Sequence, residues 1–233
     1  VVRQHLQMEN FFTGGFMVRS NKTSNESHNI KHIEDKQVEA ELEKIAQEVR
    51  KCAKCGLGSL RTNAVPGEGN PNARIVFVGE GPGADEDAQG RPFVGRSGQL
   101  LDKIIANGMG LKRSDVFICN IIKCRPPDNR DPRPEEIISC LPYLQTQIEL
   151  INPEIIVALG AHAAKSLLNN NISIGQLRGQ FHEYYTGIGR TPIKLMPTYH
   201  PAYLLRNYSD DNRKRVWDDM KKVLAELALP VPK

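Results

Sequence analysis

The chain has 233 residues, a formal net charge of +4 and no apolar run of the 18 or so residues that a spanning helix needs. Its N-terminus lacks a basic segment followed by an apolar one, so we expect a soluble, cytoplasmic protein rather than a secreted or membrane protein. Residues 1–50 carry a net charge of −1 and residues 51–233 a net of +5. This modest basic excess fits phosphate contact without requiring it.

The predicted elements begin after a polar segment with no sustained hydrophobic period. We therefore expect a flexible tail over residues 1–37 and a folded domain over residues 38–233. From Val38 to about Lys51, apolar residues recur at helical spacing and predict an amphipathic helix. Four short runs then predict buried strands, at 74–79, 116–122, 154–159 and 193–196, and the first three are rich in Val and Ile, as strands covered on both faces are.

Helical patterns separate and follow these runs, at 97–107, 133–151, 161–168 and 210–227. Strands that alternate with helices predict an α/β fold with three layers, α/β/α, around a mostly parallel four-stranded sheet. In such a sheet, ligands bind beyond the carboxyl ends of the strands. The segments at that edge are GEGPG (79–83), Asn120 with KCRPP (123–127), GAH (160–162) and PTYHP (197–201).

None of these segments decides the chemistry by pattern alone. The turn at 79–83 has neither the dinucleotide fingerprint nor the Lys-Ser/Thr pair of a Walker loop, so a binding site and a tight turn with solvated acids both stay open. A single His200 is compatible with a structural or a catalytic role. Asn120 at a strand end is compatible with a turn or a site.

Five cysteines are present, an odd number that argues against a disulfide framework. Cys52 and Cys55 form a C-x-x-C pair, Cys124 follows after 68 intervening residues, and Cys140 after 15 more. Four thiolates from separate segments can hold zinc or a [4Fe–4S] cluster, and the spacing does not choose between them. The alternative is a redox-inert pair with buried core cysteines. Cys119 lies inside a predicted strand and is best explained as a core residue.

Taken together, four motifs resemble a known family. They are the C-x-x-C pair, GEGPG with GRPFVGRSGQLL, CNIIKCRPPDNRDPRPEE and MPTYHPAYLL, in this order. Over about residues 45–225 they resemble the family 4, iron–sulfur uracil-DNA glycosylases. The resemblance implies a monofunctional hydrolase that releases uracil from DNA and leaves an abasic site, in base excision repair. It also implies a [4Fe–4S] cluster on the matching cysteines, which are Cys52, Cys55, Cys124 and Cys140.

The resemblance also implies roles for single residues in binding the base. Phe93 matches the aromatic residue on which uracil stacks, and Asn120 matches the amide that pairs with the uracil edge. His200 matches the histidine that stabilises the leaving uracil anion near O2. Backbone N–H groups around Glu80 and Gly81 are further candidates for that role.

Water activation does not transfer from the better-known uracil glycosylases. Their turn reads GQDPY and supplies an aspartate, whereas Gly81 occupies that place here. Glu80 is therefore our first candidate to position water, and Asp85 is the second. Glu86 matches a family acid near the uracil edge.

DNA contacts are expected on both sides of the site. Tyr203, Leu204 and Leu205 could wedge into the duplex, or they could pack in an ordinary loop. Arg206 and the 125–130 loop, with Arg125 and Arg130, could contact phosphates. The stretch CRPPDNRDPRP lacks the His-ending basic insert of the related subfamily that bonds covalently to DNA, so we expect full turnover.

The tail carries one more signal. Residues 5–12 resemble a sliding-clamp binding box, with Met8, Phe11 and Phe12 at the apolar positions and His5 in place of the usual Gln. Random scatter of apolar residues is the alternative. For the whole chain, the rival to a monomeric enzyme acting on uracil-containing DNA is a non-catalytic iron–sulfur module that binds DNA in replication.

Overall fold

The computed structural model describes residues 24–187 and 190–232. The chain divides into a unit of residues 1–34 and a unit of Asp35–Lys233. Of the first unit, the structure describes only the beginning of helix α2 (Ser24–Lys51), which starts well before the predicted Val38. The clamp-like segment at residues 5–12 lies outside the described residues.

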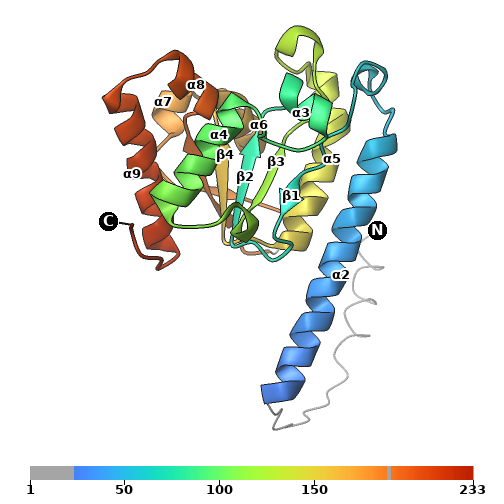
Figure 1. Ribbon diagram of the computed structural model, residues 1–233, viewed down its shortest axis with the longest axis vertical. Coiled ribbons are helices and arrows are strands. Elements are labelled where there is room, and N and C mark those ends of the chain that lie inside the picture. The colour runs from blue at the N-terminus through green and yellow to red at the C-terminus, as the bar shows by residue number, and fades with distance from the viewer. Residues whose placement is uncertain (1–23, 188–189, 233) are drawn as a thin grey trace, which may run out of the picture. The chain divides into compact units, whose positions relative to one another are not determined.

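A mixed sheet forms the centre of the second unit (Figure 1). In the described residues it has six strands, in the spatial order β1-β3-β2-β4-β6-β5. Their bounds are β1 Glu68–Gly69, β2 Ile75–Gly79, β3 Phe117–Asn120, β4 Ile155–Leu159, β5 His182–Tyr184 and β6 Ile193–Thr198. The four central strands β3, β2, β4 and β6 are parallel, and β1 and β5 add antiparallel pairs at the two edges.

These four central strands are the predicted ones, but the sheet has two strands more than we expected. β2 and β4 are buried along their whole length, as their continuous apolar sequences IVFVG and IIVAL indicate. The edge strands are very short and partly polar, with the sequences EG and HEY. An edge strand is covered less completely, so its sequence carries no apolar run that a pattern could detect.

Helices cover both faces of the sheet, which confirms the three-layer α/β/α fold. Their bounds are α3 Ala84–Gln89, α4 Arg96–Lys103, α5 Pro134–Ile151, α6 Ala161–Leu168, α7 Ile174–Leu177, α8 Pro201–Arg206 and α9 Asp210–Glu226. Single turns η2 (Gly56–Ser59), η4 (Arg113–Asp115) and η5 (Pro127–Asn129) and the π-helical turn η3 (Ile104–Gly108) complete the set. The predicted helix at 97–107 thus continues from α4 into η3.

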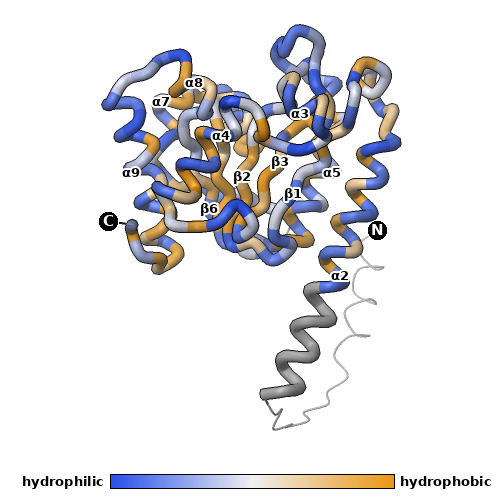
Figure 2. Tube along the Cα trace, viewed as in Figure 1, coloured by the Kyte–Doolittle hydropathy of each residue, from blue (hydrophilic) through white to orange (hydrophobic). Residues whose placement is uncertain are grey.

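Two hydrophobic cores result from the alternation of side chains along each strand. On one face, Val76 and Val78 of β2 belong to a core with α2, α5 and α6. On the other face, Ile75 and Phe77 of β2 pack in a core with α4, η3 and α9. Figure 2 shows apolar residues concentrated along the central strands, with hydrophilic residues on the outer helices and loops. No helix among the described residues is both long and apolar enough for a membrane span.

Candidate active site at the carboxyl edge of the sheet

One large cleft lies at the carboxyl edge of the parallel strands. Much of its lining comes from the carboxyl ends of those strands and the segments that follow them, at 80–86, 120–132, 159–162 and 199–206, and residues 93–97 and 174–175 complete it. Carboxyl ends of parallel strands meet at one edge, so residues far apart in the sequence converge there. The cleft therefore lies where the sequence rule placed it.

Phe93, Asn120 and His200 surround one pocket within this cleft. The rings of Phe93 and His200 have centroids 5.7 Å apart and are tilted by 34°. Gly79, the last residue of β2, lies between Phe93 and Asn120. A Cβ atom on Gly79 would stand 2.6 Å from Cζ of Phe93 and 2.4 Å from Oδ1 of Asn120. The pocket thus depends on Gly79, the first residue of the GEGPG motif, to which the sequence analysis gave no role of its own.

Asn120 presents a buried amide to this pocket. Its side chain is 1% exposed, and Oδ1 has no hydrogen-bond partner among the described residues. A buried acceptor without a partner costs about 1–3 kcal/mol, so a ligand N–H would recover that free energy. The backbone beside the amide is held by Lys123, whose Nζ donates to the Asn120 carbonyl (3.0 Å) and to Oε1 of Gln147 (2.7 Å). Burial lowers the pKa of Lys123.

His200 is held as a neutral ring with a defined tautomer. Its Nδ1 accepts the backbone N–H of Ala202 at 3.0 Å, so the proton of the neutral ring is on Nε2. Burial lowers the pKa of His200 to about 4, the charge of Arg206 acts in the same direction, and Glu86 opposes it. Gly160 (φ +94°) passes under the ring, and a Cβ there would lie 2.9 Å from Cβ of His200.

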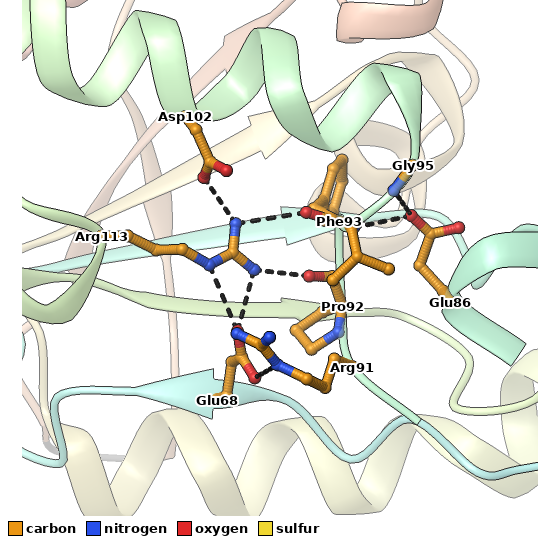
Figure 3. Close-up of polar contacts among 9 residues, drawn as sticks. Glu68, Glu86, Arg91, Pro92, Phe93, Gly95, Asp102 and Arg113 are labelled. Carbon is orange, nitrogen blue, oxygen red and sulfur yellow. Dashed lines mark hydrogen bonds and ion pairs between the residues drawn. The ribbon is translucent and has the colours of Figure 1, made fainter. Parts of the chain in front are cut away.

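Glu86 supports the loop that carries Phe93. Its Oε1 accepts the N–H groups of Val94 and Gly95, both at 2.9 Å, and its Oε2 accepts that of Gly83 at 3.1 Å (Figure 3 shows the Gly95 bond). Glu86 lines the cleft and is 9% exposed. Because both carboxylate oxygens bond to backbone groups, the side chain shapes the pocket wall.

Glu80 also lines the cleft, in a group that the sequence did not predict. One ligand atom each of Glu80, Asp131 and His162 lies within 4.8 Å of the others, and Nε2 of His162 is 3.6 Å from Oδ2 of Asp131. Burial raises the pKa of Glu80, Asp131 raises it further, and His162 lowers it. Only the position of the 160–162 segment at the sheet edge pointed to this group beforehand.

Asp85 and Gly81 occupy other parts of the cleft. Asp85 lies against Gly95, where a Cβ would be 2.5 Å from its Oδ2. Gly81 lies against Ile122, and a Cβ on Gly81 would stand 2.7 Å from that side chain. A larger residue at this position would therefore have to displace Ile122.

The sequence of this chain is similar to those of known proteins. A family model described as the uracil DNA glycosylase superfamily matches residues 66–221. The type-4 uracil-DNA glycosylase of Saccharolobus solfataricus is 50% identical over 191 residues, which cover 80% of this chain and 87% of that protein. The corresponding enzyme of Thermotoga maritima is 49% identical over 182 residues, covering 78% and 92%. That of Archaeoglobus fulgidus is 45% identical over 186 residues, covering 78% and 91%.

This chain is a type-4 member of the uracil-DNA glycosylase superfamily. The family assignment made from the four motifs is thereby confirmed. The [4Fe–4S] cluster is an expectation from the sequence motifs, so the cysteines of this member require their own test.

Four of the five cysteines of this family member line one small cavity away from the cleft: Cys52, Cys55, Cys124 and Cys140. They come from the turn that follows α2, the loop after β3 and helix α5. Nη1 of Arg61 donates to Sγ of Cys124 at 2.9 Å, and the Lys123 N–H donates to Sγ of Cys140 at 3.2 Å. Burial raises the pKa of both of these thiols, that of Cys140 to about 11. Four sulfur donors with N–H groups aimed at the sulfur atoms fit an iron–sulfur cluster. Cys119 is buried in β3, as expected of a core residue.

Only some of the side chains that we expected to contact DNA are exposed. Leu204 is 4% exposed and Leu205 is 40% exposed, because neighbouring residues of α8 point to different sides. Of the two alternatives that the sequence left open, the burial of Leu204 favours packing within the protein over a wedge. Arg130 and Arg206 line the cleft, and Arg130 pairs with Glu136 at 2.6 Å. Arg125 lies outside the cleft lining and donates to Oδ1 of Asn129 at 2.8 Å.

Proposed function

We propose that this cleft binds a uracil base extruded from DNA and that the chain hydrolyses the N-glycosidic bond, leaving an abasic site. The observation that carries the proposal is the convergence of Phe93, Asn120 and His200 on one pocket. An enzyme that acts on a base must take it out of the stack, and a pocket that stacks and hydrogen-bonds the base repays that cost. The named activity of the type-4 relatives supports the same conclusion.

Recognition of uracil falls to Asn120 and Phe93. The amide offers an acceptor and a donor side by side, which complements N3–H and O4 of uracil. Cytosine has an acceptor and an amino group in those places, so it would leave buried polar atoms unpaired. Phe93 supplies the stacking face, an interaction worth about 1–3 kcal/mol per base.

Cleavage of the bond between C1′ and N1 leaves the electron pair on uracil and positive charge on the sugar. In our proposal, Nε2–H of His200 donates to O2 of uracil, where the negative charge develops. The ring enters the reaction neutral, since its pKa lies near 4, and it needs no proton from solvent. Donors placed in advance where charge develops typically contribute about a hundredfold or more to the rate.

Attack of water on C1′ completes the hydrolysis, and we assign its positioning first to Glu80 and second to Asp85. Burial raises the pKa of Glu80 toward the working pH, where a general base is most effective. Asp131 adjoins Glu80 and strengthens the same shift. The role of Gly81 and Glu86 is to shape the wall that carries these groups.

We infer that Cys52, Cys55, Cys124 and Cys140 hold a [4Fe–4S] cluster. When bound, the cluster would supply a cross-link between three segments that lie far apart in the sequence. Arg61 and the Lys123 N–H would orient and stabilise the thiolate ligands through their bonds to sulfur.

Contacts with the DNA backbone are proposed for Arg206 and Arg130 at the cleft, for Arg125 beside it, and for Leu205 as the duplex wedge. Three expectations from the sequence stay predictions: a clamp-binding segment at residues 5–12, a monomer, and a location with the DNA in the cytoplasm. The tail boundary near residue 37 is also a prediction.

An oligonucleotide with one uracil, incubated with the protein and then treated with alkali, tests the function. Wild type should give strand cleavage at the uracil, and Asn120→Ala should slow base release at least about a hundredfold. Asn72→Ala is the matched control, because Asn72 is exposed and precedes β2 at the opposite end of the sheet. A wild-type protein that binds the oligonucleotide without cleaving it would favour the non-catalytic module instead.

A further inference from the structure

Phe93 has a backbone conformation that needs support. Its φ is +50°, in the left-handed region that residues other than glycine rarely adopt. Such a conformation costs about 1–3 kcal/mol and persists only where surrounding contacts impose it. The carbonyl of Phe93 also lies against Gly98 of α4, where a Cβ would be 2.0 Å from the carbonyl oxygen. The ring that faces the pocket is therefore held by a strained and closely packed segment.

Arg113 supplies that support from the turn before β3 (Figure 3). Its Nη1 donates to the carbonyl of Phe93 at 3.2 Å, and its Nη2 donates to the carbonyl of Pro92 at 2.5 Å. The same guanidinium is fixed by Glu68, at 3.0 Å from Nη2, and by Asp102, at 2.6 Å from Nη1. A planar guanidinium with several donors in fixed directions suits this set of partners, and a lysine would not satisfy them all.

The segment from residue 92 to 95 is thus held by hydrogen bonds from two side chains. Arg113 binds its carbonyls, and Glu86 binds the N–H groups of Val94 and Gly95. Arg113 is only 24% exposed in its side chain, and both carboxylates beside it compensate its charge. This geometry disfavours a phosphate contact and points to a role within the protein.

We propose that Arg113 is a positioning residue that holds Phe93 in the orientation needed to stack on the base. This inference rests on the proposed function. Without the guanidinium, the two carbonyls lose their donor and the backbone of Phe93 can relax out of the left-handed region. Displacement of a contact group by about 1 Å can slow a reaction up to about a hundredfold.

The test measures single-turnover release of uracil from a uracil-containing oligonucleotide. Arg113→Ala should slow release about ten- to a hundredfold. Arg113→Lys, which keeps a cation but not the fork, should give an intermediate rate. Binding of an oligonucleotide with an abasic analogue, which has no base to stack, should stay within about twofold of wild type in all variants.

Arg74→Ala is the matched control. Arg74 also forms an ion pair, with Glu154, and donates to a backbone carbonyl, that of Leu227, at 3.0 Å. It directly precedes β2, at the end of the sheet opposite the cleft. Loss of Arg74 removes contacts similar to those lost in Arg113→Ala. If these losses acted only through general stability, they would lower the rates of uracil release by both variants alike. We expect Arg74→Ala to release uracil at the wild-type rate.

A double-mutant cycle with Phe93→Ala decides whether Arg113 acts through the ring. If it does, Arg113→Ala should add little to the defect of Phe93→Ala. Equal slowing in both backgrounds, or full activity of Arg113→Ala alone, would overturn the proposal while leaving the proposed function intact. A wild-type protein without uracil release would overturn the proposed function and this inference with it.

Discussion

Acid should destabilise the folded protein through His200, because the ring is kept neutral in the fold. Its pKa there is about 4, whereas an exposed histidine in the unfolded chain has a pKa of about 6.5. Below the latter value the unfolded chain binds a proton that the folded chain does not bind. The stabilisation is therefore complete above about pH 6.5 and is lost progressively as the pH falls toward the folded-state value.

The size of the effect follows from the two pKa values. Each pH unit over which one extra proton is bound by the unfolded chain changes the free energy of unfolding by about 1.4 kcal/mol. From about pH 7.5 to about pH 5.5, His200 therefore accounts for a loss of at most about 1.4 kcal/mol. The ring keeps a partly exposed edge in the cleft, which makes this figure an upper value.

Urea unfolding of wild type and His200→Gln at both pH values isolates this contribution. Other titrating groups act alike in the two proteins, so their effects cancel in the difference between the two losses of stability. On acidification, the free energy of unfolding of the variant should fall by up to about 1.4 kcal/mol less than that of wild type. The same loss in both proteins would refute the argument that the fold keeps His200 neutral.

Two further predictions concern the water-positioning group and the cluster. Asp131→Asn removes a charge that raises the pKa of Glu80. The acid limb of kcat/KM should then move to lower pH, since Glu80 must be ionised to act, and a limb that moves upward would contradict this role. Cys140→Ser should lower the iron content and the visible absorbance of the purified protein and reduce its Tm. Cys119→Ser, the buried control, should keep the iron and the absorbance. Full iron content in Cys140→Ser would exclude Cys140 as a ligand.

Several parts of the fold could be predicted because their signals are local. The central strands are apolar on both faces, so β2 and β4 appear in the sequence as uninterrupted Val- and Ile-rich runs. The edge strands β1 and β5 could not be found this way. Each depends on pairing with a neighbour across the sheet, and neither carries a hydrophobic pattern of its own.

Much of the candidate site was also predictable, from motifs and from the rule that ligands bind at the carboxyl edge. Phe93, Asn120 and His200 were named from the sequence, and the structure brings them together. Arg113 and Lys123 were given no role. Each bonds to a residue of a separate segment, Phe93 for Arg113 and Gln147 for Lys123, and nothing in the local pattern distinguishes either from a solvated surface charge.

The amino-acid sequence by itself determined the alternation of strands and helices, the family, and the residues that meet at the edge of the sheet. Hydrophobic periodicity and motif order are properties of neighbouring residues, so they can be analysed without coordinates. Only the tertiary structure decided the tautomer of His200, the strained backbone of Phe93 and the inward position of Leu204. It also decided that two carboxylates compensate the charge of Arg113. Each of these depends on the distance and direction between groups from separate segments, and folding alone establishes those distances.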